Sequence, residues 1–405
     1  MAQLTPFRAL RPALSVASRV ASVPYDVVNT AEARVMALGE PLSFLRVTRS
    51  EIDLPDTVSP YDNAVYARAV ANLRDLRAAA PLVVDAEPTL YFYRQQMGTH
   101  VQTGLAGCFS VDEYERDLVK KHEKTQPDKE DDRTRHMLEV GAQTGIVFLT
   151  YRASAAVDAI ALRVCAGASL YDFTAADGIR HTVWPVSSFD VSALVAAFAP
   201  IPELYIADGH HRAASAARAR AALRDWGTPS QEADVFIGVA FSDTQLQILP
   251  YHRAVKDLWR HTQASFLDAL RSRLAVSDGP PEPNRPGHVS MFLGGCWHTL
   301  QLPQSPAGTA LADALDVSVL QRDVLAPVLG IGDPRTDKRI DFVGGVRGPG
   351  ALEALVASGQ AAVAFALYPV TVGDLLAISD AGGIMPPKST WFEPKLRDGL
   401  LVHQI

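Results

Sequence analysis

The sequence predicts an α+β fold, in which mixed sheets of mostly antiparallel strands are interspersed with helices. Three observations lead to this prediction. Tyr171 to Val186 has alternating apolar residues around an Asp177-Gly178 turn, which is typical of a β-hairpin. The apolar runs 235–241 and 245–249 follow one another closely, as paired strands do. Strands and helices show no regular alternation, which disfavours a doubly wound parallel sheet.

The individual elements follow from apolar periodicity and from turn residues. Proline punctuates residues 1–30, which predicts an extended segment, and residues 62–79 have the apolar spacing of a helix. Helices are also expected at 154–168 and 211–226, and the latter follows the short buried strand 204–207. Further strands or short apolar elements are expected at 82–84, 90–93, 104–109 and 146–151. The Pro/Gly-rich stretch 277–287 predicts a surface loop.

Length and composition limit the class of protein. The chain has 405 residues, of which 48% are hydrophobic, enough for two or three packed lobes. We expect a lobe at 1–110, a core at 111–260 and a third lobe at 261–405 that contributes a Pro-rich loop to the site. The net charge of −7 disfavours a general nucleic-acid binder, which carries a basic excess.

The N-terminal residues and the cysteines point to an intracellular location. Residues 1–20 contain three arginines and no continuous apolar stretch, so they do not read as a signal peptide. No window has the ~18 apolar residues of a membrane span. Cys108, Cys165 and Cys296 follow no metal-ligand spacing. We therefore expect a cytoplasmic protein with no membrane partner, and a homodimer is left open.

The strongest candidate site is the turn Asp208-Gly209-His210-His211-Arg212, between a strand and a helix. Glycine allows the sharp turn and the close approach of a ligand. Free N–H groups and the helix dipole favour an anion at the helix start. His210, His211 and Arg212 add donors, and an arginine can hold phosphate with two hydrogen bonds. Asp208 is expected to bind Mg²⁺ or to act on a proton.

Two other interpretations of this turn remain open. Asp208 can be an ordinary helix cap followed by surface histidines. A zinc site is the other alternative, but His210 and His211 are adjacent and lack the i, i+4 spacing that lets two histidines face one metal. We therefore expect no zinc.

A second candidate lies in the charged segment 121–136. Glu123 is an acid, Thr125 a hydroxyl, and Asp131 and Asp132 are metal-capable carboxylates. Phosphoryl transfer needs charge neutralisation and a base on the attacking hydroxyl. The other polar residues that we place near this site are His122, Lys124, Lys129 and Arg133. Pro127 separates a loop from a following helix. The alternative interpretation is a solvated helix face.

A third candidate is the segment Met385 to Lys395, in which three prolines exclude an ordinary helix or a central strand. It contains Lys388, Ser389, Thr390 and Lys395, which could close over phosphates, and the aromatic pair Trp391-Phe392. A well-anchored structural loop is the alternative.

Weaker candidates lie elsewhere in the chain. Arg253 follows a strand and can add a cation to the site, whereas Pro24-Tyr25-Asp26 reads more often as a tight turn. The chain contains no Walker A motif, no Gly-x-Gly-x-x-Gly after a strand and no Gly-x-Ser-x-Gly. We accordingly expect neither NAD nor flavin.

Several blocks in the same order resemble a bacterial family known as domain of unknown function 1015, DUF1015, along essentially the whole chain. They are residues 6–12, 23–28, Ile340-Asp341-Phe342, and the blocks containing His122-Glu123-Lys124-Thr125, Asp208-Gly209-His210-His211-Arg212 and Met385-Pro386-Pro387-Lys388-Ser389-Thr390. The family name implies no activity.

The turn itself resembles the phosphate-binding turn of the ParB and sulfiredoxin superfamily, over residues 183–240. That group includes CTP-binding partition proteins, ATP-dependent sulfiredoxins and free serine kinases. The resemblance implies a ParB/sulfiredoxin-like strand-turn-helix core with additional lobes, and nucleotide phosphates at residues 209–212. Sulfiredoxin has a cysteine in this turn and this chain has none there. The base implied by the kinases matches either Glu123 or Glu203 here.

The expected function is therefore that of a small-molecule kinase. ATP or ADP with Mg²⁺ would phosphorylate a hydroxyl of a small metabolite, with free serine the first candidate. Glu123, Asp208 and His210 would be catalytic, and Lys388 and Lys395 would neutralise charge. A nucleotide-binding switch protein of ParB type, and a phosphatase or other hydrolase that uses the same anion site, are the alternatives.

Overall fold

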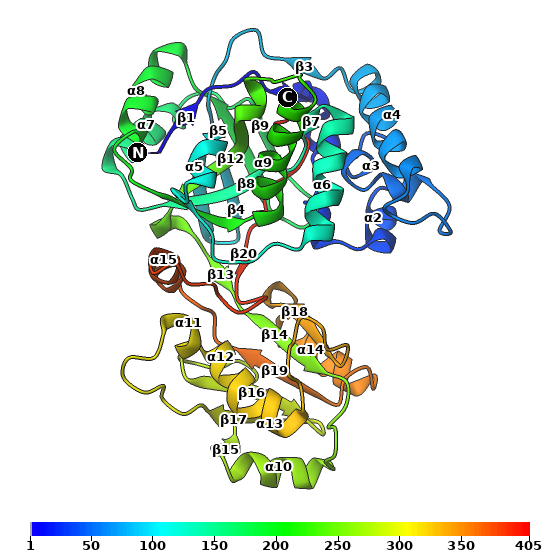
Figure 1. The fold of residues 1–405 in the computed structure, drawn as a ribbon, viewed down its shortest axis with the longest axis vertical. Helices are drawn as coiled ribbons and strands as arrows, with labels where there is room; N and C mark the ends of the chain where they lie inside the picture. The colour runs from blue at the N-terminus through cyan, green and yellow to red at the C-terminus, as the bar shows by residue number, and fades with distance from the viewer. Residues whose placement is uncertain (1) are drawn as a thin grey trace. The chain divides into compact units, whose positions relative to one another are not determined.

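The computed structural model describes residues 2–405, which form two compact units. The first unit comprises the described residues up to Leu246 together with Pro394–Ile405, and the second is Gln247–Glu393. The chain thus leaves the first unit once and returns to it, and Figure 1 shows both chain ends in that unit. This division differs from the three expected lobes, because it groups residues from both sides of residue 110 in one unit. The fold is mixed α+β with several sheets, as expected.

Within the described residues, the sheet of the first unit has nine strands. Along the chain they are β1 (Leu4–Thr5), β4 (Tyr91–Met97), β5 (His100–Ser110), β6 (Val119–Lys120), β8 (Val147–Tyr151), β9 (Tyr171–Thr174), β10 (Arg180–Pro185), β11 (Leu204–Asp208) and β12 (Val235–Ser242). Their order is β6-β11-β8-β12-β5-β4-β10-β9, with β1 beside β5. Only β6 with β11 and β8 with β12 are parallel among the described pairs of this sheet.

Helices cover this sheet and extend the first unit. They are α1 (Ala17–Val20), α2 (Thr30–Met36), α3 (Leu45–Thr48), α4 (Asn63–Ala79), α5 (Val111–Glu115), α6 (Pro127–Val140), α7 (Ala155–Val164), α8 (Ser188–Phe198) and α9 (His210–Asp225). Figure 1 shows α6 beside α9, and the two helices pack closely. Ala213, Ala216 and Ala219 of α9 are buried in the hydrophobic core of this unit.

Short strand pairs tie the C-terminal residues into the first unit. β7 (Ala142–Gln143) pairs with β21 (His403–Gln404), and β2 (Leu10–Arg11) pairs with β3 (Val83–Val84). Single bridges join Leu10 to Val402 and Ser22 to Asp398. The segment that follows Pro394 therefore lies against N-terminal residues.

The second unit has an antiparallel sheet of six described strands in the order β15-β17-β16-β19-β14-β18. The strands are β14 (Tyr251–Val255), β15 (Ala275–Asp278), β16 (His288–Leu293), β17 (Cys296–Gln301), β18 (Ile340–Gly344) and β19 (Val363–Leu367). The helices are α10 (Gln263–Arg271), α11 (Leu311–Ala314), α12 (Asp316–Leu320), α13 (Ala326–Leu329), α14 (Gly348–Ala357) and α15 (Val372–Asp380). β13 (Ile248–Leu249), at the start of the second unit in the sequence, pairs with β20 (Trp391–Phe392), at its end in the sequence.

Most predicted elements are present, but one predicted pairing is wrong. Helices at 62–79 and 211–226 correspond to α4 and α9, and Pro127 begins α6 as expected. The strands at 235–241 and 245–249 do not pair with each other. β12 pairs with β5 and β8, while β13 pairs with β20, because the chain passes from one unit to the other after Leu246.

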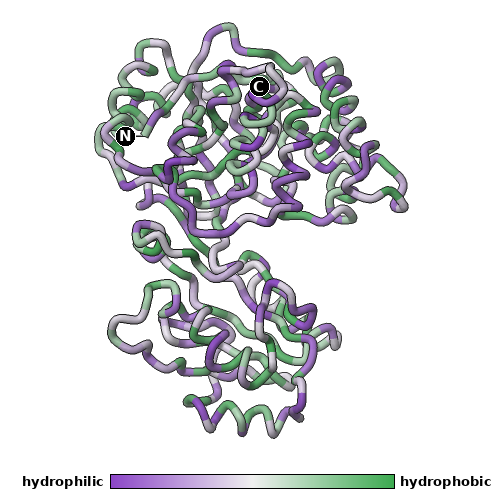
Figure 2. The backbone as a smooth tube through the Cα atoms, in the orientation of Figure 1, coloured by the Kyte–Doolittle hydropathy of each residue, from purple (hydrophilic) through white to green (hydrophobic). Residues whose placement is uncertain are grey.

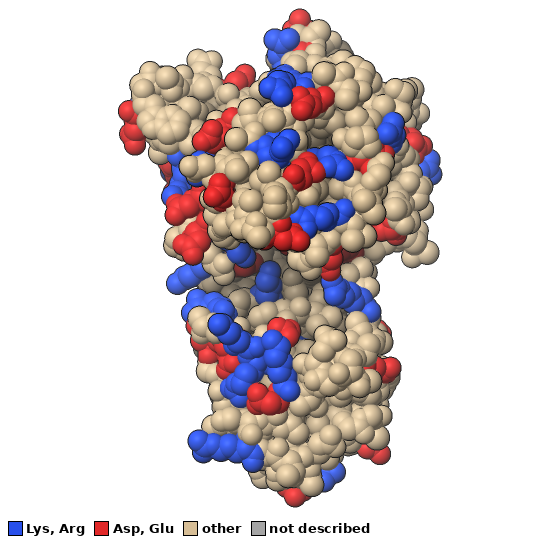
Figure 3. Space-filling model, turned by 90° about the vertical axis from the view of Figure 1, so that its right-hand side faces the viewer, with Lys and Arg blue, Asp and Glu red and all other residues tan. Residues whose placement is uncertain are grey.

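Hydrophobic and hydrophilic residues are mixed along the whole chain. Figure 2 shows hydrophobic and hydrophilic stretches alternating throughout, and none of the described helices combines the length and the apolar character that crossing a membrane requires. On the face in Figure 3, basic and acidic side chains lie interspersed over the first unit. Arg218 and Glu130 of the first unit form one ion pair, at 3.2 Å.

Candidate functional site

The candidate turn lies where β11 ends and α9 begins. Gly209 has a left-handed backbone, with φ of 93°, and a Cβ atom there would lie 3.2 Å from Cδ of Arg212. Glycine is therefore needed both for the conformation and for the close approach. As the residue preceding the helix it offers no side-chain acceptor, so α9 begins without a side-chain cap. The first-turn N–H groups and the positive end of the helix dipole thus suit an anion.

Asp208 is held as a carboxylate by its surroundings. Its Oδ1 accepts the backbone N–H of Gly209 at 2.9 Å, and its Oδ2 lies 3.0 Å from Nζ of Lys395. Burial alone would raise the pKa of Asp208, but the charges of Lys395 and Arg212 outweigh burial and hold it well below 3.8. Asp208 is consequently charged at any physiological pH and not suited to exchanging a proton.

The segment after β6 reaches the same edge of the sheet as the turn. β6 is parallel to β11, with Val119 opposite Leu204 and Lys120 opposite Tyr205. Since the carboxyl ends of parallel neighbours meet at one edge, the residues after Lys120 lie beside the start of α9. One side-chain donor atom from each of His122, Glu123 and His210 lies within 4.8 Å of the others. The expected approach of Glu123 to the turn is therefore observed.

The two histidines of this group are buried and pack edge to face. Their ring centroids are 4.5 Å apart with planes at 88°, and the backbone N–H of His122 donates to Nε2 of His210 at 3.4 Å. Burial lowers the pKa of His122 to about 4. Burial, together with the neighbouring His122, lowers the pKa of His210 well below 6.5. Both rings are therefore neutral at pH 7.

His211 holds the loop that precedes α6. Its Nε2 accepts the backbone N–H of Gln126 at 3.0 Å, immediately before Pro127 begins the helix. The other candidates of this segment differ in exposure: Thr125 is half-buried, whereas Lys124 and Lys129 are exposed. Glu203, the alternative base, lies at the opposite end of β11 and forms an ion pair with Lys120 at 2.8 Å. Of the two glutamates, only Glu123 lies at the turn.

Arg212 does not have the position that we expected for a phosphate ligand. The side chain is 5% exposed, and one terminal nitrogen donates to the carbonyl of Ile146 at 2.7 Å. The other lies 2.6 and 2.8 Å from the two carboxylate oxygens of Asp26. The terminal nitrogens of Arg212 thus already bind protein groups, and these bonds link the start of α9 to Ile146 and Asp26.

The sequence analysis interpreted Tyr25 and Asp26 mainly as part of a tight turn and did not single out Asp398. The ring of Tyr25 lies under two guanidinium groups, 5.5 Å from that of Arg212 and 4.4 Å from that of Arg133. Asp398 is 1% exposed, and burial raises its pKa to about 7. The short block Pro24-Tyr25-Asp26 was the available signal, but its role depends on contacts with residues far along the chain.

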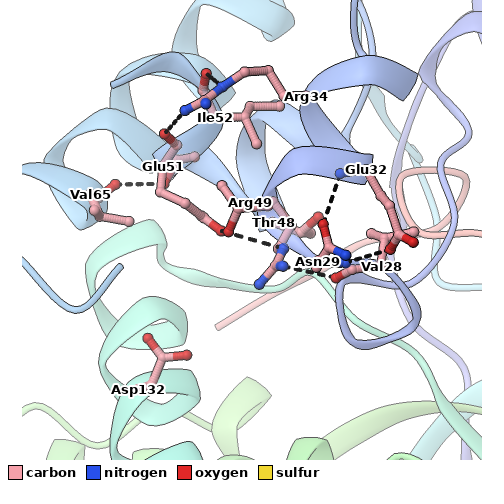
Figure 4. A network of polar contacts seen from close by, with 12 residues as sticks. Val28, Asn29, Glu32, Arg34, Thr48, Arg49, Glu51, Ile52, Val65 and Asp132 are labelled. Carbon is pink, nitrogen blue, oxygen red and sulfur yellow. Dashed lines mark hydrogen bonds and ion pairs between the residues drawn. The ribbon is translucent and has the colours of Figure 1, made fainter. Parts of the chain in front are cut away.

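A polar network joins the residues at the start of α2 to the segment 48–52 (Figure 4). Arg49 donates to the carbonyl of Val28 at 2.8 Å and lies 3.4 Å from buried Glu51. Asn29 caps α2 in a reciprocal box with Glu32. Arg133 donates to the carbonyl of Thr48 at 3.2 Å and forms an ion pair with Asp132. Arg133, a candidate site residue, therefore has a supporting position in this network.

The C-terminal candidate segment is divided between the two units. Lys395 belongs to the first unit, where Gln95 donates to its carbonyl at 2.7 Å while its ammonium group binds Asp208. Lys388, Ser389 and Thr390 belong to the second unit.

Within the second unit, Arg253 fixes the loop of these residues. It donates to the carbonyls of Pro387 and Lys388 at 3.3 and 3.0 Å, and burial lowers the pKa of Arg253 to about 9. Lys388 has an unusual positive φ of 57°, and Ser389 donates to the carbonyl of Pro386 at 2.6 Å. These contacts hold the segment as a fixed loop within its own unit.

The chain thus has an α+β fold. One edge of its large sheet carries an uncapped helix start, a glutamate and two buried histidines. The chain belongs to the family described as Protein of unknown function (DUF1015), which it matches over residues 4–318. The family resemblance seen in the sequence is thereby confirmed.

The solved structures to which the chain is similar have low sequence identity to it and low TM-scores. A conserved hypothetical protein from Pyrococcus furiosus is 13% identical, with 73% of this chain and 94% of that chain covered and a TM-score of 0.36. A free serine kinase in complex with AMP is 12% identical, with 73% and 91% covered and a TM-score of 0.37. SbnI from Staphylococcus aureus is 13% identical, with 73% and 86% covered and a TM-score of 0.39. No curated protein matches the chain.

Proposed function

We propose that this protein is a nucleotide-dependent phosphotransferase that phosphorylates the hydroxyl of a small metabolite, with ATP or ADP as the donor and free serine as the first acceptor to test. One observation carries the proposal. An uncapped helix start and a glutamate carboxylate, the groups that phosphate binding and proton removal need, lie at the same sheet edge.

The phosphates are assigned to the start of α9. The backbone N–H groups of His210 and His211 belong to its first turn, whose dipole is positive, and Gly209 lets a ligand approach the backbone. Lys395 brings a cation to this turn through its ion pair with Asp208. Arg212 acts through its contacts as a positioning residue.

Glu123 is assigned as the base for the acceptor hydroxyl. Its carboxylate is half-buried and lies within 4.8 Å of a ring nitrogen of His210. A base must reach the hydroxyl directly or through one water, and this position at the helix start meets that condition for an acceptor beside the phosphates. Asp208 fits Mg²⁺, because each of its bonded oxygens keeps a further lone pair for a ligand.

The phosphate site is tested by nucleotide-dependent thermal shifts. ATP, ADP, CTP and GTP, each with Mg²⁺, are added to the wild type, Gly209→Ala and Gly227→Ala. Both glycines have a positive φ, but Gly227 follows the end of α9 and has open space around it. A ligand at ~100 times its dissociation constant stabilises the fold by about 2.7 kcal/mol. We expect one nucleotide to shift the wild type and Gly227→Ala but not Gly209→Ala.

Turnover is tested with Glu123→Gln, which keeps the side-chain size and removes the base. With nucleotide and serine, ³¹P NMR is expected to show a phosphomonoester in the wild type and at least about 100 times less in the variant, since a general base contributes 10²–10⁴-fold. Nucleotide-induced thermal shifts should be unchanged. Release of free phosphate without an acceptor would instead indicate a hydrolase, and no shift with any nucleotide would contradict the proposal.

A further inference from the structure

We propose that His122, Glu123 and His210 together bind a divalent first-row transition-metal ion of the zinc class. The sequence alone argued against zinc, because the adjacent His210 and His211 cannot both face one metal. The structure supplies a different partner for His210, namely His122 at the end of the neighbouring parallel strand. This inference does not rest on the proposed function, because it requires no nucleotide and no acceptor.

The spacing of the three side chains is close to that of a metal site. One donor atom from each lies within 4.8 Å of the others, and an ion bound at 2.0–2.2 Å needs donor separations of roughly 3–4 Å. The adjustment required is thus on the order of 1 Å. Glu123 is the half-buried member of the group, while the histidine rings lie in the interior at 2% and 5% exposure.

The set of donors favours transition metals over magnesium or calcium. Imidazole suits zinc and its neighbours, whereas magnesium and calcium prefer oxygen ligands alone. Two histidines and one glutamate form a set that is known from catalytic zinc sites, in which a fourth position stays open for water or a ligand. The set is therefore suited to an ion that also contacts a bound molecule.

The surroundings of His122 resemble those of a metal ligand. Its ring also hydrogen bonds to the backbone of Ile206 in β11. Metal-ligating histidines generally use their second ring nitrogen in this way, which fixes both the tautomer and the orientation of the ring. The bond from the His122 backbone to His210 is long, at 3.4 Å, and so restrains the second ring only weakly.

Other buried histidines in the described part of the chain have ordinary structural roles. His136 bonds the carbonyl of Val47 at 2.9 Å, and His252 accepts the backbone N–H of Leu367 at 3.2 Å. Across residues 2–405, no other group of three His, Cys, Asp or Glu side chains brings its donor atoms equally close. The triad of His122, Glu123 and His210 is thus distinguished from them by geometry.

The metal site is tested by titrating untagged, EDTA-treated full-length protein with Co²⁺ and following the visible absorption of the bound ion. We expect one equivalent to bind and Zn²⁺ to displace it. His122→Ala and Glu123→Gln should each weaken binding by at least about 100-fold, because even a change in the residues behind a ligand costs 10–100-fold. The matched control His136→Gln, buried in the same unit, should bind Co²⁺ like the wild type.

Folding and nucleotide binding are measured on the same variants, so that the two proposals can fail separately. Far-UV circular dichroism shows whether His122→Ala is folded, and half-buried Glu123 gives a second variant that is less disruptive. Saturable Co²⁺ binding that disappears in both folded variants supports the site, with or without nucleotide-dependent thermal shifts. Unchanged binding in Glu123→Gln, or no one-to-one binding by the wild type, would overturn it.

Discussion

Arg212 illustrates how the protein partners of a single residue depend on distant parts of the chain. The sequence placed it at a helix start, where arginine commonly binds phosphate. The carboxylate of Asp26 and the carbonyl of Ile146 take up its terminal nitrogens instead. The sequence around position 212 does not predict these partners, because Asp26 lies 186 residues away and Ile146 lies 66 residues away. The position of Asp208, Gly209 and His210 between a strand and a helix was predictable because that strand-turn-helix is encoded locally.

The contact between Asp26 and Arg212 gives a prediction about stability. Asp26→Asn leaves a buried guanidinium with a weaker partner, but the Asp26 side chain is 37% exposed, so water partly compensates. We expect a loss of about 1–2 kcal/mol, between the values for exposed and buried pairs. Urea unfolding measures it. The control Asp172→Asn, from an exposed pair with Arg180, should change the free energy of unfolding by less than about 1 kcal/mol.

Asp398 gives a prediction about pH. Burial raises its pKa from 3.8 to about 7, so the folded chain holds this proton between about pH 4 and pH 7 while the unfolded chain has released it. The stability that the protonated Asp398 contributes is therefore fully present below pH 4. As the pH rises to 7 it is lost, and the free energy of unfolding falls by up to about 4 kcal/mol. Asp398→Asn should remove this loss.

The buried histidines change stability with pH in the opposite direction. Their effect must therefore be separated from that of Asp398. His122, His136 and His252 have pKa values lowered to about 4 by burial, so they destabilise the fold as the pH falls below about 6.5. The informative quantity is the difference in unfolding free energy between Asp398→Asn and the wild type. The variant should become more stable relative to the wild type as the pH rises from 5 to 8. A difference that does not change with pH would contradict the raised pKa of Asp398.

At the scale of elements, the site depends on a strand pair that the sequence did not reveal. β6 has two residues, too few for a periodic pattern, and it lies in a densely charged stretch. Its parallel pairing with β11 nevertheless brings His122 and Glu123 to the turn. The longer elements α4, α9 and the β9–β10 hairpin were predictable because their apolar periods or turn residues are local.

The centre of the large sheet gives a prediction about packing. Gly104 lies in β5, and a Cβ atom there would approach Cγ1 of Val239 to 2.5 Å. Gly104→Ala should therefore destabilise the first unit by about 1–3 kcal/mol, because a close-packed core must shift to accept the methyl group. Chemical unfolding measures the loss. Val101→Ala on the same strand alters an exposed residue and should stay within about 0.5 kcal/mol of the wild type.

At the scale of the whole molecule, the second unit is an insertion into the first. The chain leaves after Leu246 and returns at Pro394, and the three hydrophobic clusters described for the first unit contain no residue from 247–393. The sequence did not predict this, because no composition change marks either junction and the Pro-rich stretch 277–287 lies inside the second unit. Discontinuous units are defined by contacts between distant residues, which a single sequence does not display.

The insertion leads to a prediction about a shortened chain. The backbone N–H of Glu393 donates to the carbonyl of Gln247 at 3.3 Å, so the two junctions are adjacent and a short Gly-Ser linker can join Leu246 to Pro394. We expect the shortened chain to unfold cooperatively, as followed by circular dichroism, because it keeps every residue of its own core. If the shortened chain is unfolded, the first unit does not fold independently of the second, and the prediction is wrong.

The same shortened chain decides which of the candidate residues the nucleotide needs. It retains His210, His211 and Lys395 and lacks Lys388, Ser389 and Thr390. If the first unit holds the complete phosphate site, the nucleotide that stabilises the full chain should raise the melting temperature of the shortened chain as well, and Gly209→Ala should abolish that shift in both. A folded shortened chain that gives no shift would assign a binding group to residues 247–393, and Lys388→Ala in the full chain would then be the variant to measure.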